Sequence, residues 1–119
     1  MTIDERIQTM LYGIEDIIAP NVYDGAALEY LVYNYYSSGA IFAESRPRAL
    51  VYSVMVHFYL PRGVNPTAKK NDISEAIFAA GGTWPAVSNA SDSEGQHYVF
   101  EFQMSAGNEP QEPETDGDA

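Results

Sequence analysis

His57 and His97 are the only two histidines in this chain of 119 residues, and they are the side chains best suited to metal or acid–base chemistry. Each lies on the more polar face of a predicted strand, so the imidazoles meet if these strands pair. With Glu101 they could then form a metal site or an acid–base site. The chain has no helical HExxH motif that would support such a site. Half-buried strand histidines are the simpler interpretation, and we expect no catalytic, cofactor-binding or metal-binding residues.

Other familiar site motifs are absent or incomplete. The chain has no cysteine, which excludes thiol nucleophiles, thiolate metal sites and disulfides. The acidic turn SDSEG at residues 91–95 lacks the ligand pattern of a calcium loop, so we interpret it as a solvated turn. Gly81-Gly82 is typical of a helix end, and neither phosphate-binding glycine motif is present.

The charge of the chain is strongly acidic, with a formal net charge of −11. Residues 107–119 carry five acids and no base, and the remaining body is still acidic, with 12 acids against 6 bases. This balance opposes binding to a nucleic-acid phosphate backbone, which needs a basic surface. The apolar runs are too short to cross a membrane, and the acidic N-terminus does not resemble a signal peptide. We therefore expect synthesis in the cytoplasm and no membrane partner.

Two helices are predicted. Near the N-terminus, apolar side chains recur at helical spacing: Ile3, Ile7, Met10, Leu11, Ile14, Ile17 and Ile18. Thr2 and Glu5 have the spacing of a capping box, and Pro20 ends the pattern, which predicts a helix from about residue 2 to residue 19. The second helix is predicted from Asn65-Pro66 to about Ala80, because Asn followed by Pro is typical of a helix start.

Several segments have the alternation or the β-branched and aromatic content of strands: residues 27–36, 40–44, 49–60, 84–90 and 96–104. Residues 37–39 are predicted to form a turn, so that the segments 27–36 and 40–44 make a hairpin. Residues 45–48 are predicted to end the second of these strands before the third begins at residue 49. The apolar faces of the third and last strands are predicted to point inward: Leu50, Tyr52, Val54, Val56, Phe58 and Leu60, with Tyr98, Phe100, Phe102 and Met104.

The resulting order is α-β-β-β-α-β-β. It predicts an α+β domain over residues 1–105, with a mainly antiparallel sheet of four to five strands and two helices packed on it. Residues 106–119 are predicted to form a disordered acidic tail.

The first predicted strand carries four of the nine tyrosines within seven positions. Tyr30 and Tyr36 point to one face, and Tyr33 and Tyr35 to the other. Both faces need a cover, yet two helices can cover only one. We expect the helices on the Tyr30 face and a neighbouring subunit or partner on the Tyr33 and Tyr35 face, although tyrosines are also ordinary strand residues.

Five of the six basic residues lie between positions 46 and 70, whereas acids concentrate in the first helix and the C-terminal third. A basic edge that meets an acidic neighbour would favour head-to-tail assembly, and ordinary surface scatter is the alternative. The candidate interface residues are therefore Tyr33, Tyr35, Arg46, Arg48 and Arg62.

The order of several short sequence motifs resembles that of a known family. The N-terminal helix precedes Pro20 and the loop word Tyr23-Asp24-Gly25, and a strand follows that reads YLVYNY from residue 30. A later strand ends in HFYLP from residue 57, and the last strand reads HYVFEF from residue 97. Over residues 1–105 this order resembles small structural proteins of long-tailed bacteriophages and prophages, and more narrowly the siphophage and prophage tail terminator family, whose members join the tail to the head.

The resemblance implies a structural virion protein and not an enzyme, with no cofactor and no catalytic residues to carry over. Members of the family assemble as homo-oligomeric rings, commonly hexamers, that cap the tail tube. They bind the tail tube protein and a head-completion or connector protein, and DNA passes through the ring without specific binding. The implied location is the head–tail junction of the virion, after assembly in the bacterial cytoplasm.

Two alternatives from other functional classes stay open. The tyrosine-rich strand could line a pocket of a small-molecule or peptide-binding module. A histidine-dependent enzyme would require His57, His97 and Glu101 within hydrogen-bond or ligand distance of one another.

Overall fold

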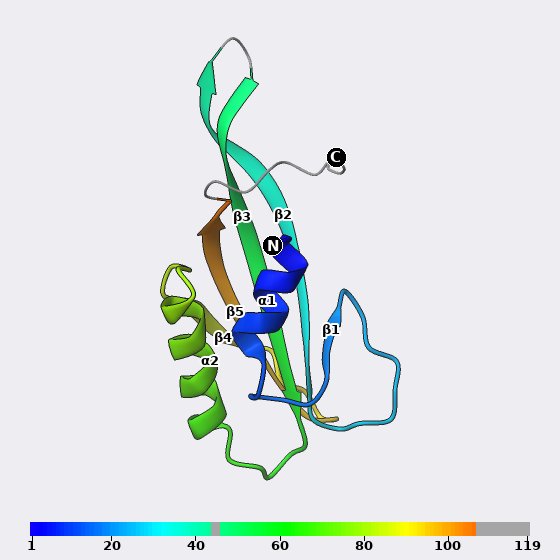
Figure 1. The fold of residues 1–119 in the computed structure, drawn as a ribbon. Coiled ribbons are helices and arrows are strands. Elements are labelled where there is room, and N and C mark those ends of the chain that lie inside the picture. Colours follow the sequence, from blue (N-terminus) through cyan, green and yellow to red (C-terminus); the bar gives the residue numbers. More distant parts are fainter. Residues whose placement is uncertain (44–45, 107–119) are drawn as a thin grey trace.

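The protein forms a five-stranded sheet with both helices on one of its faces (Figure 1). The computed structural model describes residues 1–43 and 46–106, with the backbone alone at residues 39–43 and 46–49. The elements follow the order α1 (Ile3–Leu11), β1 (Ile18–Pro20), β2 (Tyr30–Ala43), β3 (Arg46–Leu60), α2 (Thr67–Ala79), β4 (Ala86–Asn89) and β5 (Gln96–Ser105). This confirms the predicted fold class and element order. No helix among the described residues is long and apolar enough to span a membrane.

The sheet has the strand order β1-β2-β3-β5-β4, in which β1 runs parallel to β2 and every other pair is antiparallel. The long β3 is central, as its β-branched and aromatic sequence favours. The short β4, which follows Pro85, forms one edge. The sheet is therefore built around the β2–β3 hairpin, onto which the other three strands add.

The first helix ends at Leu11, so the prediction that it continues to residue 19 is wrong. Its start is as predicted, because Thr2 and Glu5 form the capping box. Gly13 has a φ of +88°, a conformation that ends a helix and that glycine adopts without a Cβ clash. Ile14 and Ile18 still pack against the core from a turn and from β1, which explains why the apolar periodicity outlasts the helix.

The predicted turn at residues 37–39 and the predicted break at residues 45–48 are also wrong. β2 continues to Ala43, and β3 already begins at Arg46, which pairs with Ala43. The ladder accommodates the glycine through a register shift between Gly39 and Ile41. The three strands between α1 and α2 are therefore β1, β2 and β3. The predicted segments 27–36 and 40–44 both fall largely within the single strand β2, and β1 was not predicted.

The second helix agrees with the prediction to within two residues. The Asn65 side-chain oxygen accepts a hydrogen bond of 3.0 Å from the Thr67 amide at its start. At its end, Gly81 has a φ of +96°. Buried Ile73 and Ile77 face the sheet.

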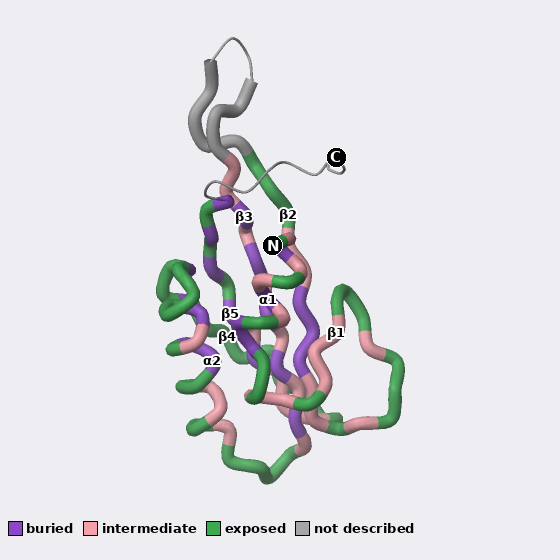
Figure 2. Tube along the Cα trace, in the orientation of Figure 1, coloured by how far each residue is buried: buried purple, intermediate pink, exposed green. Residues whose placement is uncertain are grey.

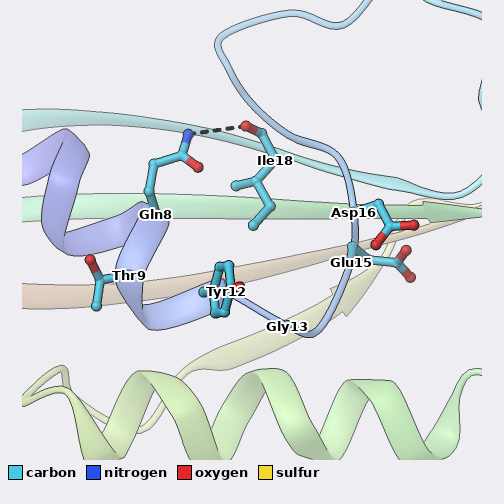
Figure 3. A pocket seen from close by; sticks show the side chains of 7 residues that line it. All are labelled: Gln8, Thr9, Tyr12, Gly13, Glu15, Asp16 and Ile18. Atoms are coloured by element: carbon cyan, nitrogen blue, oxygen red, sulfur yellow. Dashed lines mark hydrogen bonds between the residues drawn. The ribbon is translucent and has the colours of Figure 1, made fainter.

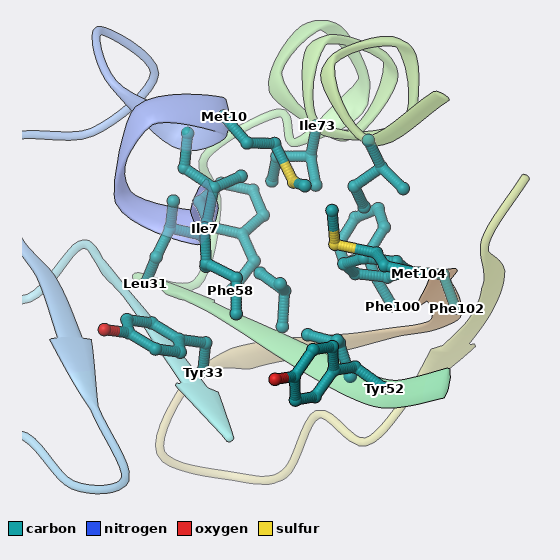
Figure 4. Packing of buried hydrophobic residues seen from close by; sticks show 14 of the residues in the cluster. Ile7, Met10, Leu31, Tyr33, Tyr52, Phe58, Ile73, Phe100, Phe102 and Met104 are labelled. Atoms are coloured by element: carbon teal, nitrogen blue, oxygen red, sulfur yellow. The ribbon is translucent and has the colours of Figure 1, made fainter. Parts of the chain in front are cut away.

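The core lies between the two helices and one face of the sheet (Figure 4). α1 contributes Ile7, Met10 and Leu11, and the inward faces of β3 and β5 are those predicted from sequence. Figure 2 shows how burial follows this arrangement, with buried positions on the helices and strands where they face one another. The described chain ends in this core, since Ala106 is buried and its amide binds the Leu50 carbonyl. The tail was predicted to begin at residue 106, but Ala106 belongs to the core, and residues 107–119 lie outside the described residues.

α1 lies on the Tyr33 and Tyr35 face of β2, so the prediction that the helices cover the Tyr30 face is wrong. The Asp4 carboxylate accepts hydrogen bonds from the Tyr33 hydroxyl at 3.0 Å and the Tyr35 hydroxyl at 2.8 Å. Burial, reinforced by this carboxylate, raises the pKa of both phenols, so both stay donors. Tyr33 is only 2% exposed and belongs to the core of the protomer.

We expect Asp4→Ala to lower the free energy of unfolding by about 2–3 kcal/mol, because it removes two hydrogen bonds to a charged group and leaves the Tyr33 and Tyr35 hydroxyls without this acceptor. Urea denaturation measures the change. Asp16→Ala is the matched control, since Asp16 is an exposed acid outside this contact and should change stability by less than about 0.5 kcal/mol. Equal losses in the two variants would contradict this account of helix docking.

Candidate functional site

The sheet face opposite the helices carries the polar and aromatic side chains that could do chemistry. We call it the open face, and its described central positions are Tyr30, Val32, Asn34 and Tyr36 from β2, Ser53, Met55, His57 and Tyr59 from β3, and His97, Val99, Glu101 and Gln103 from β5. Most of these side chains are half-buried, and Tyr36 is 64% exposed. The open face is therefore largely apolar and aromatic without being a closed core.

A row of four rings crosses one end of the open face. Tyr30 pairs with Tyr59, which pairs with His97, so the sheet register places these rings side by side. The centroid distances are 4.8 Å from Tyr30 to Tyr59 and 4.2 Å from Tyr59 to His97. Tyr23 extends the row from the loop before β2, at 4.5 Å from Tyr30. We call these four residues the aromatic row.

The loop that carries Tyr23 depends on a close approach of its ring to Gly25. A Cβ built on Gly25 would lie 2.2 Å from the Tyr23 hydroxyl oxygen, so only glycine fits beneath the ring. The same oxygen accepts a hydrogen bond of 3.0 Å from the Ala27 amide. The packing of Tyr23 on Gly25 thus positions the ring at one end of the aromatic row.

The two imidazoles meet, as expected if their strands pair. His57 Nδ1 lies 2.9 Å from His97 Nε2, across a diagonal of the β3–β5 ladder. The Asn34 side-chain nitrogen lies 3.4 Å from His57 Nε2 and can only donate there. The His57 tautomer consistent with this placement of the Asn34 amide carries its proton on Nδ1 and donates it to His97 Nε2. We call His57 and His97 the histidine pair.

Burial favours the neutral form of both imidazoles. Burial lowers the pKa of His57, and the neighbouring His97 lowers it further. Burial also lowers the pKa of His97, against a smaller opposite effect of Asp92. A neutral imidazole has one lone pair that can accept a proton or bind a metal ion, and here a ligand would have to displace the hydrogen bond between the two rings.

Glu101 does not join the histidine pair. It is exposed, and in the sheet it lies beside Met55 of β3 and Ala86 of β4. Within residues 1–43 and 46–106, no group of three or more His, Asp or Glu side chains is arranged to hold a metal ion. The structure thus brings together two of the three residues that the sequence suggested.

Two hollows flank the histidine pair. One, of about 450 Å³, has a lining that includes Tyr30, Tyr59, His97, Arg62, Asp92 and Glu94. The other, of about 360 Å³, lies further along the sheet, with Tyr36, Met55, Glu101 and Gln103 in its lining. Their walls combine aromatic surface with charged side chains, which suits a binding role better than it suits a reaction.

A third hollow, of about 570 Å³, lies on the helix side between the end of α1 and β1 (Figure 3). Its lining consists of Gln8, Thr9, Tyr12, Gly13, Glu15, Asp16 and Ile18. The Gln8 side chain spans its inner wall and donates to the Ile18 carbonyl at 3.0 Å. This lining offers no histidine and no basic group, and its titratable side chains are Tyr12, Glu15 and Asp16.

One charged cluster was not predicted from the sequence. Lys69 Nζ of α2 lies 2.7 Å from a carboxylate oxygen of both Glu15 and Glu29. Burial and a hydrogen bond with Glu29 raise the pKa of Glu15 to about 7, whereas the pKa of Glu29 is lowered by its hydrogen bonds to Glu15 and Lys69. The cluster ties the turn after α1 and the loop before β2 to α2. No sequence signal indicated it, because Glu15 was placed within the longer predicted helix.

The candidate interface residues fall in three different places. Tyr33 and Tyr35 lie under α1, which removes the reason for assigning them to an interface. Arg62 is exposed in the loop after β3 and donates to the Ser93 carbonyl at 3.1 Å. Arg46 and Arg48 are in the part of β3 whose side chains are outside the described residues.

Comparison with known proteins shows that the fold occurs in another solved structure but identifies no family. No family model matches the chain, and no curated protein matches its sequence. Among solved structures, one chain aligns over 91% of this chain and 95% of its own length, with a TM-score of 0.53 and 10% sequence identity. At that identity the likeness shows the fold alone.

The lowered pKa values of the histidine pair predict a pH-dependent contribution to stability. The unfolded chain binds protons first as the pH falls through about 6.5, so this contribution is present above that pH and is lost below it. We expect the stability of the wild type, relative to a His57→Gln/His97→Gln variant, to fall between about pH 7 and pH 5. Urea denaturation at both pH values measures this difference, and an unchanged difference would contradict the assignment.

The raised pKa of Glu15 acts in the opposite direction. The protonated Glu15 carboxyl contributes stability that is fully present below the pKa of a glutamate in the unfolded chain. This contribution is lost as the pH rises through about 7. Glu15→Gln mimics the protonated acid, since it can accept from Lys69 and donate to Glu29. We expect this variant to gain on the order of 2 kcal/mol over the wild type between about pH 5 and pH 8. Exposed Glu75→Gln is the control, and the same gain there would contradict the prediction.

Proposed function

We propose that this chain is a structural phage or prophage protein, similar to tail terminators, that forms a homo-oligomeric ring on the end of the tail tube and joins it to the head. The observation that carries the proposal is the open face. A sheet with apolar and aromatic side chains on both faces needs a cover on each, and both described helices lie on one. Tyrosine is enriched in interface cores, and the open face presents Tyr30, Tyr36 and Tyr59.

The β2–β3 hairpin supports the same proposal. β5 pairs with β3 only as far as Val51, whereas the β2–β3 ladder continues to the pair of Ala43 and Arg46. The hairpin therefore extends beyond the rest of the sheet (Figure 1). Arg46 and Arg48 lie in this extension, in a chain whose net charge is −11. A basic arm that reaches an acidic neighbour would favour assembly of a head-to-tail ring.

In this proposal the chain performs no chemistry and carries no catalytic residue. Its partners are further copies of itself, commonly six in rings of the resembling family, the tail tube protein and a head-completion or connector protein. The acidic chain suits a lumen through which DNA passes without adhering. The protein would act at the head–tail junction after assembly in the bacterial cytoplasm.

A ligand-binding module is the second candidate, favoured by one observation. The hollow of about 450 Å³ combines the aromatic row with Arg62, Asp92 and Glu94, which could orient a small polar ligand or a peptide. A thermal shift with one ligand class that is lost in Tyr59→Ala, while the wild type stays monomeric, would favour this candidate over assembly.

The proposal predicts that Tyr36→Glu weakens self-association by about tenfold or more, because it replaces the most exposed aromatic side chain of the open face with a charge. The free energy of unfolding should change by less than about 0.5 kcal/mol, since Tyr36 is 64% exposed in the protomer. Sedimentation velocity over a range of concentrations measures association. Tyr12→Glu is the matched control, because Tyr12 is 86% exposed but lies at the end of α1, on the helix side.

The same experiment can overturn the proposal. A wild-type protein that is monomeric at high concentration and also fails to bind purified tail tubes would contradict it. Equal effects of Tyr12→Glu and Tyr36→Glu would show that assembly does not use the open face.

A further inference from the structure

We infer that the histidine pair is a binding site for a divalent transition-metal ion of the Cu²⁺ or Ni²⁺ type. The inference rests on the geometry of His57 and His97 and does not depend on the proposed assembly. The chain has no other histidine and no cysteine, so these imidazoles are its only strong ligands for such an ion.

The separation of the two ring nitrogens fits one ion. Metal–imidazole bonds are about 2.0–2.1 Å long, and two such bonds at a right angle place their nitrogens about 2.9 Å apart. His57 Nδ1 and His97 Nε2 are 2.9 Å apart. That separation is also the length of the hydrogen bond between the rings, so what it shows is that both nitrogens come within reach of a single ion. Cu²⁺ and Ni²⁺ are the ions of choice because imidazole suits them and they stand highest in the order of affinity for nitrogen ligands.

Neighbouring groups hold the two rings close together before any ion binds. Tyr59 stacks on His97 with an interplanar angle of 17° and lies nearly parallel to His57 at 16°. The His97 backbone amide donates to the Ser91 hydroxyl at 3.0 Å, which fixes the start of β5. In this hydrogen bond the two nitrogens face each other, so both rings must rotate about their Cβ–Cγ bonds to turn their lone pairs toward one ion on the open face.

Asn34 can complete the change of protonation that binding requires. The ion takes the lone pair of His57 Nδ1, so the proton there leaves and His57 Nε2 takes up a proton. Asn34, 3.4 Å from Nε2, then accepts from that N–H through its amide oxygen after the amide turns over. Ligating histidines commonly donate their second N–H in this way, which orients the ring.

The remaining coordination positions point away from the sheet. Both imidazoles are half-buried, and His97 also lines the hollow of about 450 Å³. No third His, Asp or Glu of residues 1–43 and 46–106 completes the site. Water or an added donor ligand would therefore occupy these positions, as in open metal sites.

The test uses the full chain and Cu²⁺ as the probe. We expect one ion per chain, and electron paramagnetic resonance should show coupling to two imidazole nitrogens. His57→Gln and His97→Gln should each weaken binding by more than about tenfold. The control is Glu101→Gln, which removes a carboxylate from the same face and should leave affinity unchanged.

The double variant His57→Gln/His97→Gln measures what the acids of residues 107–119 bind on their own. The inference is overturned if either single variant binds as tightly as the wild type. It is also overturned if the wild-type spectrum shows one imidazole nitrogen or none, and this outcome decides the question even where a variant fails to fold.

Discussion

The docking of both helices on a single face of the sheet is the constraint on which the rest of the structure depends. Asp4 secures it by accepting from two tyrosines of β2 at once, and Ile73 and Ile77 of α2 complete the cover. Because the helices occupy one side, the other strand face keeps its aromatic and polar side chains half-exposed. The histidine pair, the aromatic row and the hollows beside them all follow from this asymmetry.

The sheet register determines which open-face residues can act together. Tyr30, Tyr59 and His97 form one row across three strands, and His57 lies one row further along. A shift of one residue in the β3–β5 ladder would send the histidines to opposite faces. The buried alternation of β3 and β5 opposes such a shift, since it would expose Phe58 and Phe100. The core therefore maintains the distance between the imidazoles.

Much of this was predictable from the sequence, and the failures have physical reasons. The inward faces of β3 and β5 were predictable because apolar and more polar residues alternate strictly along both strands. The same alternation places both histidines on the other face, so they meet once the strands pair. The end of α1 was missed because Ile14 and Ile18 keep helical spacing while they pack from a turn and a strand. The covered face of β2 was missed because both of its faces are aromatic, and only the contact with Asp4 distinguishes them. The cluster of Glu15, Glu29 and Lys69 joins three separate segments, which no local pattern encodes.

The extension of the β2–β3 hairpin has a consequence for solubility. β1 pairs with β2 only from Leu31 to Tyr33, and β5 pairs with β3 only from Val51, so within the described backbone both outer edges of the extension lack a neighbouring strand. Unpaired edges favour indiscriminate strand addition and aggregation. Ser37, Ser38 and Gly39 on one strand, and Arg46, Pro47 and Arg48 on the other, are residues that disfavour such pairing. The residues that led to the prediction of a turn and a break therefore also disfavour aggregation of the free protein through the unpaired edges of this hairpin.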